Sequence, residues 1–489
     1  MRTFVVLFFV LLAGLLVAAA YVTDPFSRFS LIRRSFKATI KQEILTTINH
    51  NHRLHVRQAP WYKTFAVIKN GIHILSSRYV KSPRSSGASV SEIIADIRAL
   101  RFNPNKLLLT SGDHFSALFV RNLGVFYYPV LDASIPDSRH NWHDRELVYI
   151  QTLAYALGVF HKTQTLTTTI VPTGRYDATC LNFYAYPSDS LYSMLFALAA
   201  LTGSEPARAE SYGKDLHQLD SVPAAQLLLE EYKTTLQKLY HDYRHKVFDE
   251  TTGLISAHIH LSGAKDITRR ESTFYDNVIF WKTTQLAQTL GLIQKDAAFL
   301  RQLKQRILKT FWLEHEGYFL EDLSTIGQQQ KYYSSDWLIV LATGFLRPSR
   351  LAERHYFEQS IAHIQSAKID QPFALKYHND TRAHRQFLPV RLAVASYGGD
   401  AIWSFWGMEY IKSLLLLFKH TGMQDYLETA DYHIKKYEQK MLEYGGFPEV
   451  YDRNGNLLQT PFYRSIRQTG WVIGFEQVLA MRKQIKSII

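Results

Sequence analysis

The sequence predicts an all-α protein folded as an (α/α)6 toroid, in which six helical hairpins form an inner and an outer ring. Two patterns lead to this prediction. In one, an aspartate repeatedly precedes a strongly apolar helical run, and in the other, amphipathic helices alternate with these runs. The composition agrees, because 489 residues with 46% hydrophobic side chains supply the apolar surface that one large core needs.

The chain begins with an uncharged apolar segment, residues 3–23, which is long enough to cross a bilayer as a helix. Small residues at 18–20 also suit a signal peptidase, so residues 1–23 are expected to be either a transmembrane anchor or a cleaved signal. Arginines come after the segment, and the positive-inside rule would keep the main domain in the cytoplasm. Short N-terminal anchors of this kind usually export the domain behind them, so we expect a membrane-anchored, extracytoplasmic domain, with the cytoplasmic side left open.

Residues 24–90 are predicted to form an N-terminal extension that packs on the toroid, and residues 91–489 to form the toroid itself. Its outer helices carry apolar residues on one face and charged residues on the other, so they are expected at the surface. They are predicted at 91–103, 144–159, 224–243, 294–312, 350–365 and 423–440.

The inner helices are apolar nearly all round and are therefore expected to be buried. Five of them begin near an aspartate that is suited to cap the helix, and most end at a glycine suited to the C′ position. These aspartates are Asp113, Asp189, Asp276, Asp336 and Asp400, and a sixth apolar helix from Gln468 lacks the aspartate. Because the inner helices of such a ring run parallel, their N-termini and preceding loops, including 248–273, should converge at one mouth.

Glu449 lies in the loop that leads into the sixth inner helix, so it is expected at the same mouth as the aspartates. Two carboxyl groups that face each other across a pocket can act as general acid and general base. Such a pair is the usual apparatus of glycoside hydrolysis.

The stretch GGFPEVYDRNGNLLQTPFYRSIRQTGWVIGFEQVL, residues 445–479, resembles the closing stretch of the six-hairpin glycosidases. Neutral and alkaline invertases and the amylo-α-1,6-glucosidase domain of glycogen-debranching enzymes belong to this superfamily. The resemblance implies that Glu449 is the catalytic base and that Asp452 is the acidic residue that comes after it. FYDNVIFW, residues 274–281, resembles the start of the third inner helix and implies that Asp276 is the general acid.

The other inner helices keep the same order, with SDSLY at Asp189 and GGDAIWSFW at Asp400. At the first inner helix these families carry an Arg-Asp pair that helps to hold the sugar. Here Asp113 stands without the arginine, and Arg121 is a conjectural substitute.

The resemblance implies an inverting glycoside hydrolase that acts on an α-linked oligo- or polysaccharide, with its two carboxyl groups roughly 6.5–9.5 Å apart. The remaining site residues are predicted to bind hydroxyl groups or to stack on sugar rings. They are Asp113, Arg121, Asp189, Asp336, Asp400 and Asp452 for hydroxyl groups and Tyr275, Trp337 and Trp403 for stacking.

Two alternatives stay open. The missing arginine beside Asp113 suits a carbohydrate-binding or envelope protein with a degenerate site, and the net charge of +13 suits a lyase or epimerase on acidic sugars. Nucleic acid is not expected as a partner, because the basic residues are dispersed and form no recognition signature. No metal-ligand spacing or nucleotide-binding loop occurs, so neither a metal nor a cofactor is expected. The expected partners are a saccharide and, through residues 3–23, a membrane.

Overall fold

The computed structural model describes most of the chain. The described residues are 40–81, 83–101, 107–108, 112, 117–124, 142–173, 176–182, 186–204, 222–261, 263–265 and 267–486. The apolar segment 3–23 and Asp113 lie outside them, so the predictions made for these residues stay predictions. Within the described ranges, no helix is both long and apolar enough to cross a membrane.

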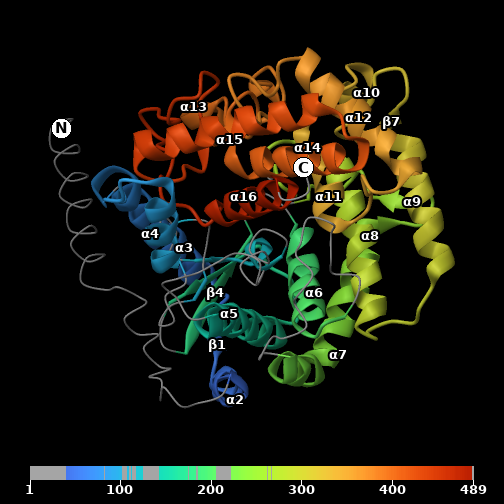
Figure 1. Ribbon diagram of the computed structural model, residues 1–489. Coiled ribbons are helices and arrows are strands. Elements are labelled where there is room, and N and C mark those ends of the chain that lie inside the picture. The colour runs from blue at the N-terminus through green and yellow to red at the C-terminus, as the bar shows by residue number, and fades with distance from the viewer. Residues whose placement is uncertain are drawn as a thin grey trace, which may run out of the picture.

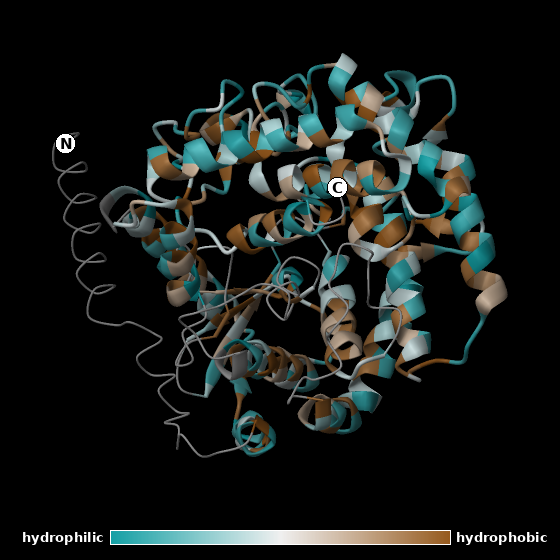
Figure 2. Cartoon of the chain, in the orientation of Figure 1, coloured by the Kyte–Doolittle hydropathy of each residue, from teal (hydrophilic) through white to brown (hydrophobic). Residues whose placement is uncertain are grey.

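The predicted outer helices all form, and Figure 1 shows all of them except α5 around the periphery of the molecule. Teal, hydrophilic residues line the outer sides of α15 and α9 in Figure 2, as the amphipathic pattern predicted. The outer helices are α4 (Val90–Arg101), α5 (Trp142–Thr163), α7 (Val222–Val247), α9 (Ala297–Phe311), α12 (Leu351–Ser366) and α15 (Gln424–Tyr444).

The inner helices pack against one another in chain order, towards the centre of Figure 1. They are α6 (Asp189–Leu201), α8 (Phe274–Thr289), α11 (Ile339–Thr343) with the preceding 3₁₀ turn η5 (Ser335–Leu338), α14 (Ser404–Thr421) and α16 (Val472–Lys486). The first outer helix, α4, packs on the last hairpin, where Arg98 forms a buried ion pair with Glu476 of α16. The beginning and the end of the toroid are therefore in contact.

The first inner element differs from the prediction. Within residues 117–124 the chain forms strand β2 (Leu118–Phe119) and the 3₁₀ turn η2 (Val120–Leu123) instead of a regular helix. β2 pairs with β3 (Thr169–Pro172), and η2 packs on α6 in the place of an inner helix. A short apolar run such as Ala-Leu-Phe-Val does not distinguish a buried helix from a strand, which is why the pattern misled.

A four-stranded sheet in the order β1-β4-β3-β2 also departs from an all-α fold. β1 (His55–Val56) runs parallel to β4 (Asp177–Leu181), and the other pairs are antiparallel. Helix α2 (Ile40–His52) packs on α5, so α5 is buried along residues 145–160 and is not the surface helix that we predicted. The extension thus adds an extra layer to this side of the toroid.

Small hairpins precede two of the inner helices. β5 (Phe248–Asp249) pairs with β6 (Leu254–Ile255) ahead of α8, and β7 (Trp312–Leu313) pairs with β8 (Tyr318–Phe319) ahead of η5. The short elements that complete the described chain lie in the connecting segments. They are α3 (Pro60–Leu75), the π-helical turn η1 (Ser76–Lys81), α10 (Thr325–Gln329), η6 (Ala383–Arg385), α13 (Leu388–Val394), β9 (Ile402–Trp403) and β10 (Val450–Tyr451).

The four aspartates of the repeat that the structure describes are not N-caps, contrary to the prediction. The N-cap positions are occupied by Ser188, Thr273, Ser334 and Trp403. Asp189, Asp276 and Asp336 lie one to three residues inside their elements, and Asp400 precedes α14 by several residues. Their side chains are therefore available for contacts other than capping.

Candidate active site

The loops that lead into the inner helices are joined to one another by hydrogen bonds. Together they form the face that we call the mouth, as the predicted parallel arrangement required. The linking bonds are Gly263 N to Ser188 Oγ (3.1 Å), Phe274 N to the Glu321 carbonyl (3.1 Å), Ser335 N to the Tyr377 carbonyl (2.9 Å) and Ser404 N to the Glu449 carbonyl (3.1 Å).

Asp276 lies in the first turn of α8, three residues after the N-cap residue Thr273. Thr273 Oγ1 accepts a hydrogen bond from the Asp276 N–H at 2.9 Å and donates one to Asp276 Oδ2 at 2.6 Å. Burial raises the pKa of the Asp276 carboxyl group, although Arg270 and the hydroxyls of Thr273 and Ser188 act to lower it. A buried carboxyl group with a raised pKa keeps its proton to higher pH than a free aspartate, as a general acid requires.

The backbone of Gly263 covers this carboxyl group. A Cβ atom at position 263 would lie 3.2 Å from Asp276 Oδ1 and 3.0 Å from Arg270 Nη2, and the residue has a φ of +27°. A larger residue at position 263 would therefore displace the acid or the arginine beside it.

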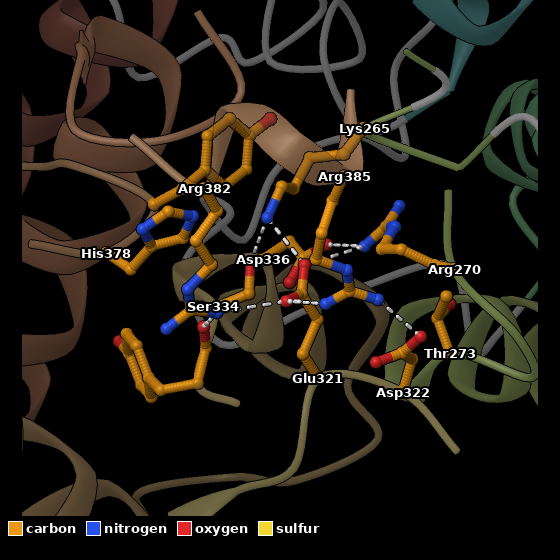
Figure 3. Close-up of polar contacts among 12 residues, drawn as sticks. Lys265, Arg270, Thr273, Glu321, Asp322, Ser334, Asp336, His378, Arg382 and Arg385 are labelled. Atoms are coloured by element: carbon orange, nitrogen blue, oxygen red, sulfur yellow. Dashed lines mark hydrogen bonds and ion pairs between the residues drawn. The ribbon is translucent and has the colours of Figure 1, made fainter. Parts of the chain in front are cut away.

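Glu321 is the centre of a buried ionic cluster (Figure 3). Lys265 Nζ lies 2.5 Å from its Oε1, while Arg385 Nη1 and Arg382 Nη1 lie 3.1 Å and 3.2 Å from its Oε2. Burial alone would raise the pKa of Glu321, but these cations and Arg270 hold it well below its usual range. The cluster joins the loops before α8 and η5 to the 378–385 segment.

Arg270 connects this cluster to the candidate acid. Its Nη1 lies 2.6 Å from Asp336 Oδ2 and 3.8 Å from Glu321 Oε1, and its charge acts on Asp276. Asp336, which was predicted to bind substrate, is thus the buried ionic partner of Arg270.

Two further buried groups of the cluster have strongly shifted pKa values. Burial lowers the pKa of Lys265 to about 8, against the attraction of Glu321 and Asp336. Burial also lowers the pKa of His378 to about 3, although Asp380 Oδ1 lies 3.0 Å from its Nδ1. His378 is therefore neutral near pH 7.

Glu449 lies on the other half of the mouth, immediately before β10, and is 6% exposed. Strand β10 pairs with β9, which runs directly into α14, so Glu449 stands at the N-terminal end of that helix. Trp471 Nε1 donates a hydrogen bond to Glu449 Oε1 at 3.4 Å. The loop of the predicted base is therefore held by contacts to two inner helices.

An arginine from the N-terminal extension interacts electrostatically with Glu449. Arg78 of η1 stacks on the ring of Tyr463, with its Cζ 4.1 Å from the ring centroid. Burial acts to lower the pKa of Arg78, but the charges of Tyr463, Tyr397 and Glu449 outweigh it and raise the pKa. The extension thus contributes a cation to the mouth, as well as packing on the toroid.

Arg121, the conjectural substitute for the missing arginine, lies beside Asp189. Its Nε lies 3.4 Å from Asp189 Oδ2, and its Nη1 donates to the Gly263 carbonyl at 2.9 Å. Tyr275 is buried nearby, where burial and Asp189 raise its pKa well above the usual value. Asp113 lies outside the described residues, so the predicted relation between Arg121 and Asp113 stays a prediction.

The acidic residues on the Glu449 half have different surroundings. Asp400 is buried and lies 3.6 Å from Arg453 Nη1, and burial raises the pKa of its carboxyl group despite that arginine. Asp452 accepts hydrogen bonds from the backbone N–H groups of Asn454 and Asn456 at 2.8 and 2.9 Å. These bonds make Asp452 a turn-forming residue.

The two tryptophans predicted to stack on sugar also differ. Trp337 is fully buried and donates to Tyr333 Oη at 3.0 Å, so it is a core side chain. Trp403 is half-buried at the mouth, where its ring contacts those of Tyr397 and Tyr377 and its Nε1 donates to the Tyr397 carbonyl at 2.8 Å. Of the two, only Trp403 has ring surface at the mouth.

Sequence reasoning missed the ionic residues around the candidate acid. The loop 248–273 was identified as functional, yet nothing in it distinguishes Arg270 from Arg269, and Glu321 lies in no motif. No sequence pattern pointed to Arg78, because it interacts with residues more than 310 positions away in the chain. In the described part of the chain, no group of three or more His, Cys, Asp or Glu side chains could hold a metal ion.

Several solved structures are similar to this chain. A rhamnosidase from Klebsiella oxytoca with rhamnose bound is 13% identical, over 82% of this chain and 65% of that one, with a TM-score of 0.49. A glycoside hydrolase family 15 glucoamylase from Hypocrea jecorina is 12% identical over 80% and 71%, with a TM-score of 0.49. A cellobiose 2-epimerase from Spirochaeta thermophila is 12% identical over 88% and 100%, with a TM-score of 0.48.

No protein-family model matches the chain, and no curated protein is similar to it in sequence. Identities of 12–13% and TM-scores below 0.5 identify neither a substrate nor a reaction for this chain.

Proposed function

We propose that the chain is an inverting glycoside hydrolase that acts on an α-linked oligo- or polysaccharide. One observation carries the proposal: Asp276 is a buried carboxyl group with a raised pKa, in the first turn of an inner helix whose N-terminal end belongs to the mouth. Glu449 supports it, because this residue lies on another loop of the same mouth.

In the proposed reaction, Asp276 donates its proton to the glycosidic oxygen as the bond to the anomeric carbon breaks. Glu449 accepts a proton from the water molecule that attacks the anomeric carbon from the opposite face. The product sugar therefore has the inverted configuration. The mechanism requires a separation of roughly 6.5–9.5 Å between the two carboxyl groups, which leaves room for the water.

The test is hydrolysis of a panel of α-linked glycosides, with the anomer of the first product followed by NMR. We expect Asp276→Asn and Glu449→Gln each to lower turnover by about 10²–10⁴-fold while leaving the fold unchanged. Asp296→Asn is the matched control, because Asp296 only caps α9, and asparagine caps a helix as well as aspartate does. Full activity in both site variants, or a product with retained configuration, would contradict the proposed mechanism.

A second candidate is lyase or epimerase chemistry on an acidic sugar, and the arginines near Glu449 favour it. Burial together with the charges of Arg84 and Arg464 lowers the pKa of Arg467 to about 10, so guanidinium groups gather beside this loop. Uronic-acid substrates in the same panel separate the two reactions, because a lyase forms an unsaturated product and an epimerase changes a ring stereocentre without cleavage. Binding without turnover would instead favour a carbohydrate-binding protein.

The location of the domain is also a proposal. We propose that residues 1–23 tether the chain to a membrane with the toroid on the extracytoplasmic side, on the basis of the apolar segment 3–23. Protease protection of the full chain in sealed vesicles tests the orientation. If the toroid is digested by a protease that reaches only the cytoplasmic side, the orientation is the reverse of the one proposed.

A further inference from the structure

Helix α3 presents an apolar face to the outside of the molecule. Trp61, Phe65, Ile68 and Leu75 are 62%, 55%, 48% and 55% exposed. Their spacing of three, four and seven residues places them along one side of the helix.

The opposite side of α3 packs on the protein and is less apolar. Its buried residues are Ala66 and Asn70, and the helix contacts β4 of the small sheet. An ordinary surface helix has the reverse orientation, with its apolar residues inward and its polar residues in water. A helix that exposes two aromatic and two aliphatic side chains on one side therefore calls for a partner on that side.

The surroundings of this face are basic. No Asp or Glu occurs from Ile44 to Ser91, whereas this stretch contains seven Lys and Arg residues: Arg53, Arg57, Lys63, Lys69, Arg78, Lys81 and Arg84. Of these, Lys63 is exposed on α3 itself, and Arg53 and Arg84 are exposed on the segments that flank it. An acidic side chain that does pair with this stretch is Asp177 of β4, whose Oδ1 lies 3.0 Å from Arg57 Nε.

We propose that α3 docks on an anionic lipid bilayer, with its apolar face in the interfacial region and its basic flanks against the headgroups. Tryptophan, phenylalanine and aliphatic residues on one face with lysines beside them are the composition of helices that lie in a membrane interface. Anionic headgroups supply the negative charge that this stretch lacks.

Two other partners could cover the apolar face of α3, namely a second copy of this chain and the chain's own N-terminal segment, and charge disfavours both. A second copy of this chain would bring the same excess of positive charge to the contact, and like charges across an interface oppose binding. The chain's own N-terminal segment carries Arg28, Arg33, Arg34 and Lys37, so it has the same disadvantage.

Docking of α3 would also hold the mouth near the membrane. The turn η1 begins at the residue after α3, and its Arg78 interacts electrostatically with Glu449. The substrate would then be a saccharide carried at the membrane surface. This consequence rests on the proposed hydrolase function, whereas the docking itself does not.

The test uses a fluorescent thiol label on the full chain with Ile68→Cys. The native Cys180 does not compete for the label, because it is buried and burial raises the pKa of its thiol to about 12. The matched control is Leu351→Cys, 79% exposed at the start of α12, which lies across the molecule from α3 in Figure 1. Both proteins are mixed with vesicles of phosphatidylcholine alone and of phosphatidylcholine with phosphatidylglycerol.

In the anionic vesicles we expect a lipid-attached quencher to reach the label at position 68 but not the label at position 351. Charge reversal at two exposed flanking positions, Arg53→Glu with Lys63→Glu, should weaken partition into these vesicles at least about tenfold. Because the label at position 68 reports only whether that position contacts lipid, the quenching result holds even if residues 3–23 bind the chain to every vesicle.

Three outcomes would overturn the docking proposal. The label at position 68 could stay in water although the chain is bound to anionic vesicles, or the wild-type chain could fail to bind them. The label could also be shielded before vesicles are added: shielding at every protein concentration would indicate the chain's own N-terminal segment, and shielding that grows with concentration would indicate a second copy. None of these outcomes affects the hydrolysis test, so the two proposals fail separately.

Discussion

Asp276 and Glu449 belong to the same mouth but have opposite kinds of surroundings. Asp276 adjoins a buried cluster in which Lys265, Arg382 and Arg385 surround the carboxylate of Glu321. Glu449 instead accepts a hydrogen bond from the Trp471 indole and acts electrostatically on Tyr463, Tyr397 and Arg78, and Arg78 stacks on the Tyr463 ring. The acid half therefore depends on compensated charges, where the loss of one partner is costly, whereas aromatic packing contributes more to the base half.

The largest expected effect is the loss of the carboxylate at the centre of the cluster. Glu321→Gln should lower the free energy of unfolding by about 3–5 kcal/mol, because it leaves buried cations without their counter-charge. The same exchange on the other half, Glu449→Gln, should cost about 1 kcal/mol or less. Urea denaturation of both variants measures the difference, and equal losses would show that the two halves do not differ in this way.

Acid should weaken the cluster half through His378. The pKa of this histidine is lowered in the folded state to about 3, so its contribution is complete above pH 6.5 and is lost as the pH falls towards 3. The loss at pH 4 is on the order of 3 kcal/mol, and His378→Asn should remove that part of the pH dependence. Thermal melts from pH 7 to pH 4 provide the measurement.

Asp380 needs its own control in this experiment, because its hydrogen bond to His378 lowers its pKa and its contribution also disappears in acid. With Asp380→Asn, most of the decline assigned to His378 should remain. A wild-type melting temperature that is constant down to pH 4 would exclude the role given to His378.

A smaller effect is expected where Arg78 stacks on Tyr463. Arg78→Leu should lower the stability by about 1–2 kcal/mol through loss of the cation–π contact. Arg78→Lys keeps a positive charge but loses the planar stacking, so it should recover only part of this loss. If neither variant changes the unfolding midpoint, the extension does not stabilise the base half.

The smallest effect is expected at the cap of α8. Thr273→Ala should cost about 1 kcal/mol, because it removes the N-cap hydroxyl. That hydroxyl also lowers the pKa of Asp276, so its loss should raise this pKa further and move the alkaline limb of the pH–rate profile to higher pH. Thr273→Ser keeps the hydroxyl and should leave the alkaline limb in place. A shift of the limb in both variants would show that it does not depend on this hydrogen bond.

Elements with a strong local period could be predicted from the sequence alone. The six outer helices were found within a few residues of their ends, because the alternation of apolar and charged faces is a local property of each segment. The start of α8 was found as well, since Phe274–Trp281 is rich in aromatic and aliphatic residues and comes directly after a polar loop.

Elements that depend on distant partners could not be predicted in this way. Residues 118–119 are a strand only because Thr169 and Ile170 lie beside them, and α5 is buried because α2 covers it. The N-cap of α8 is Thr273 and not Asp276, a choice that depends on backbone geometry at one residue.

The predominantly helical class, most of the alternation between buried and surface helices, and a candidate pair of acidic residues therefore follow from local sequence patterns. The tertiary structure decided which groups surround those acids: Arg270 and the Glu321 cluster for Asp276, and Arg78 with its aromatic neighbours for Glu449. The physical reason is that periodicity acts over one or two helical turns, whereas burial and charge compensation arise between side chains that only the folded chain brings together.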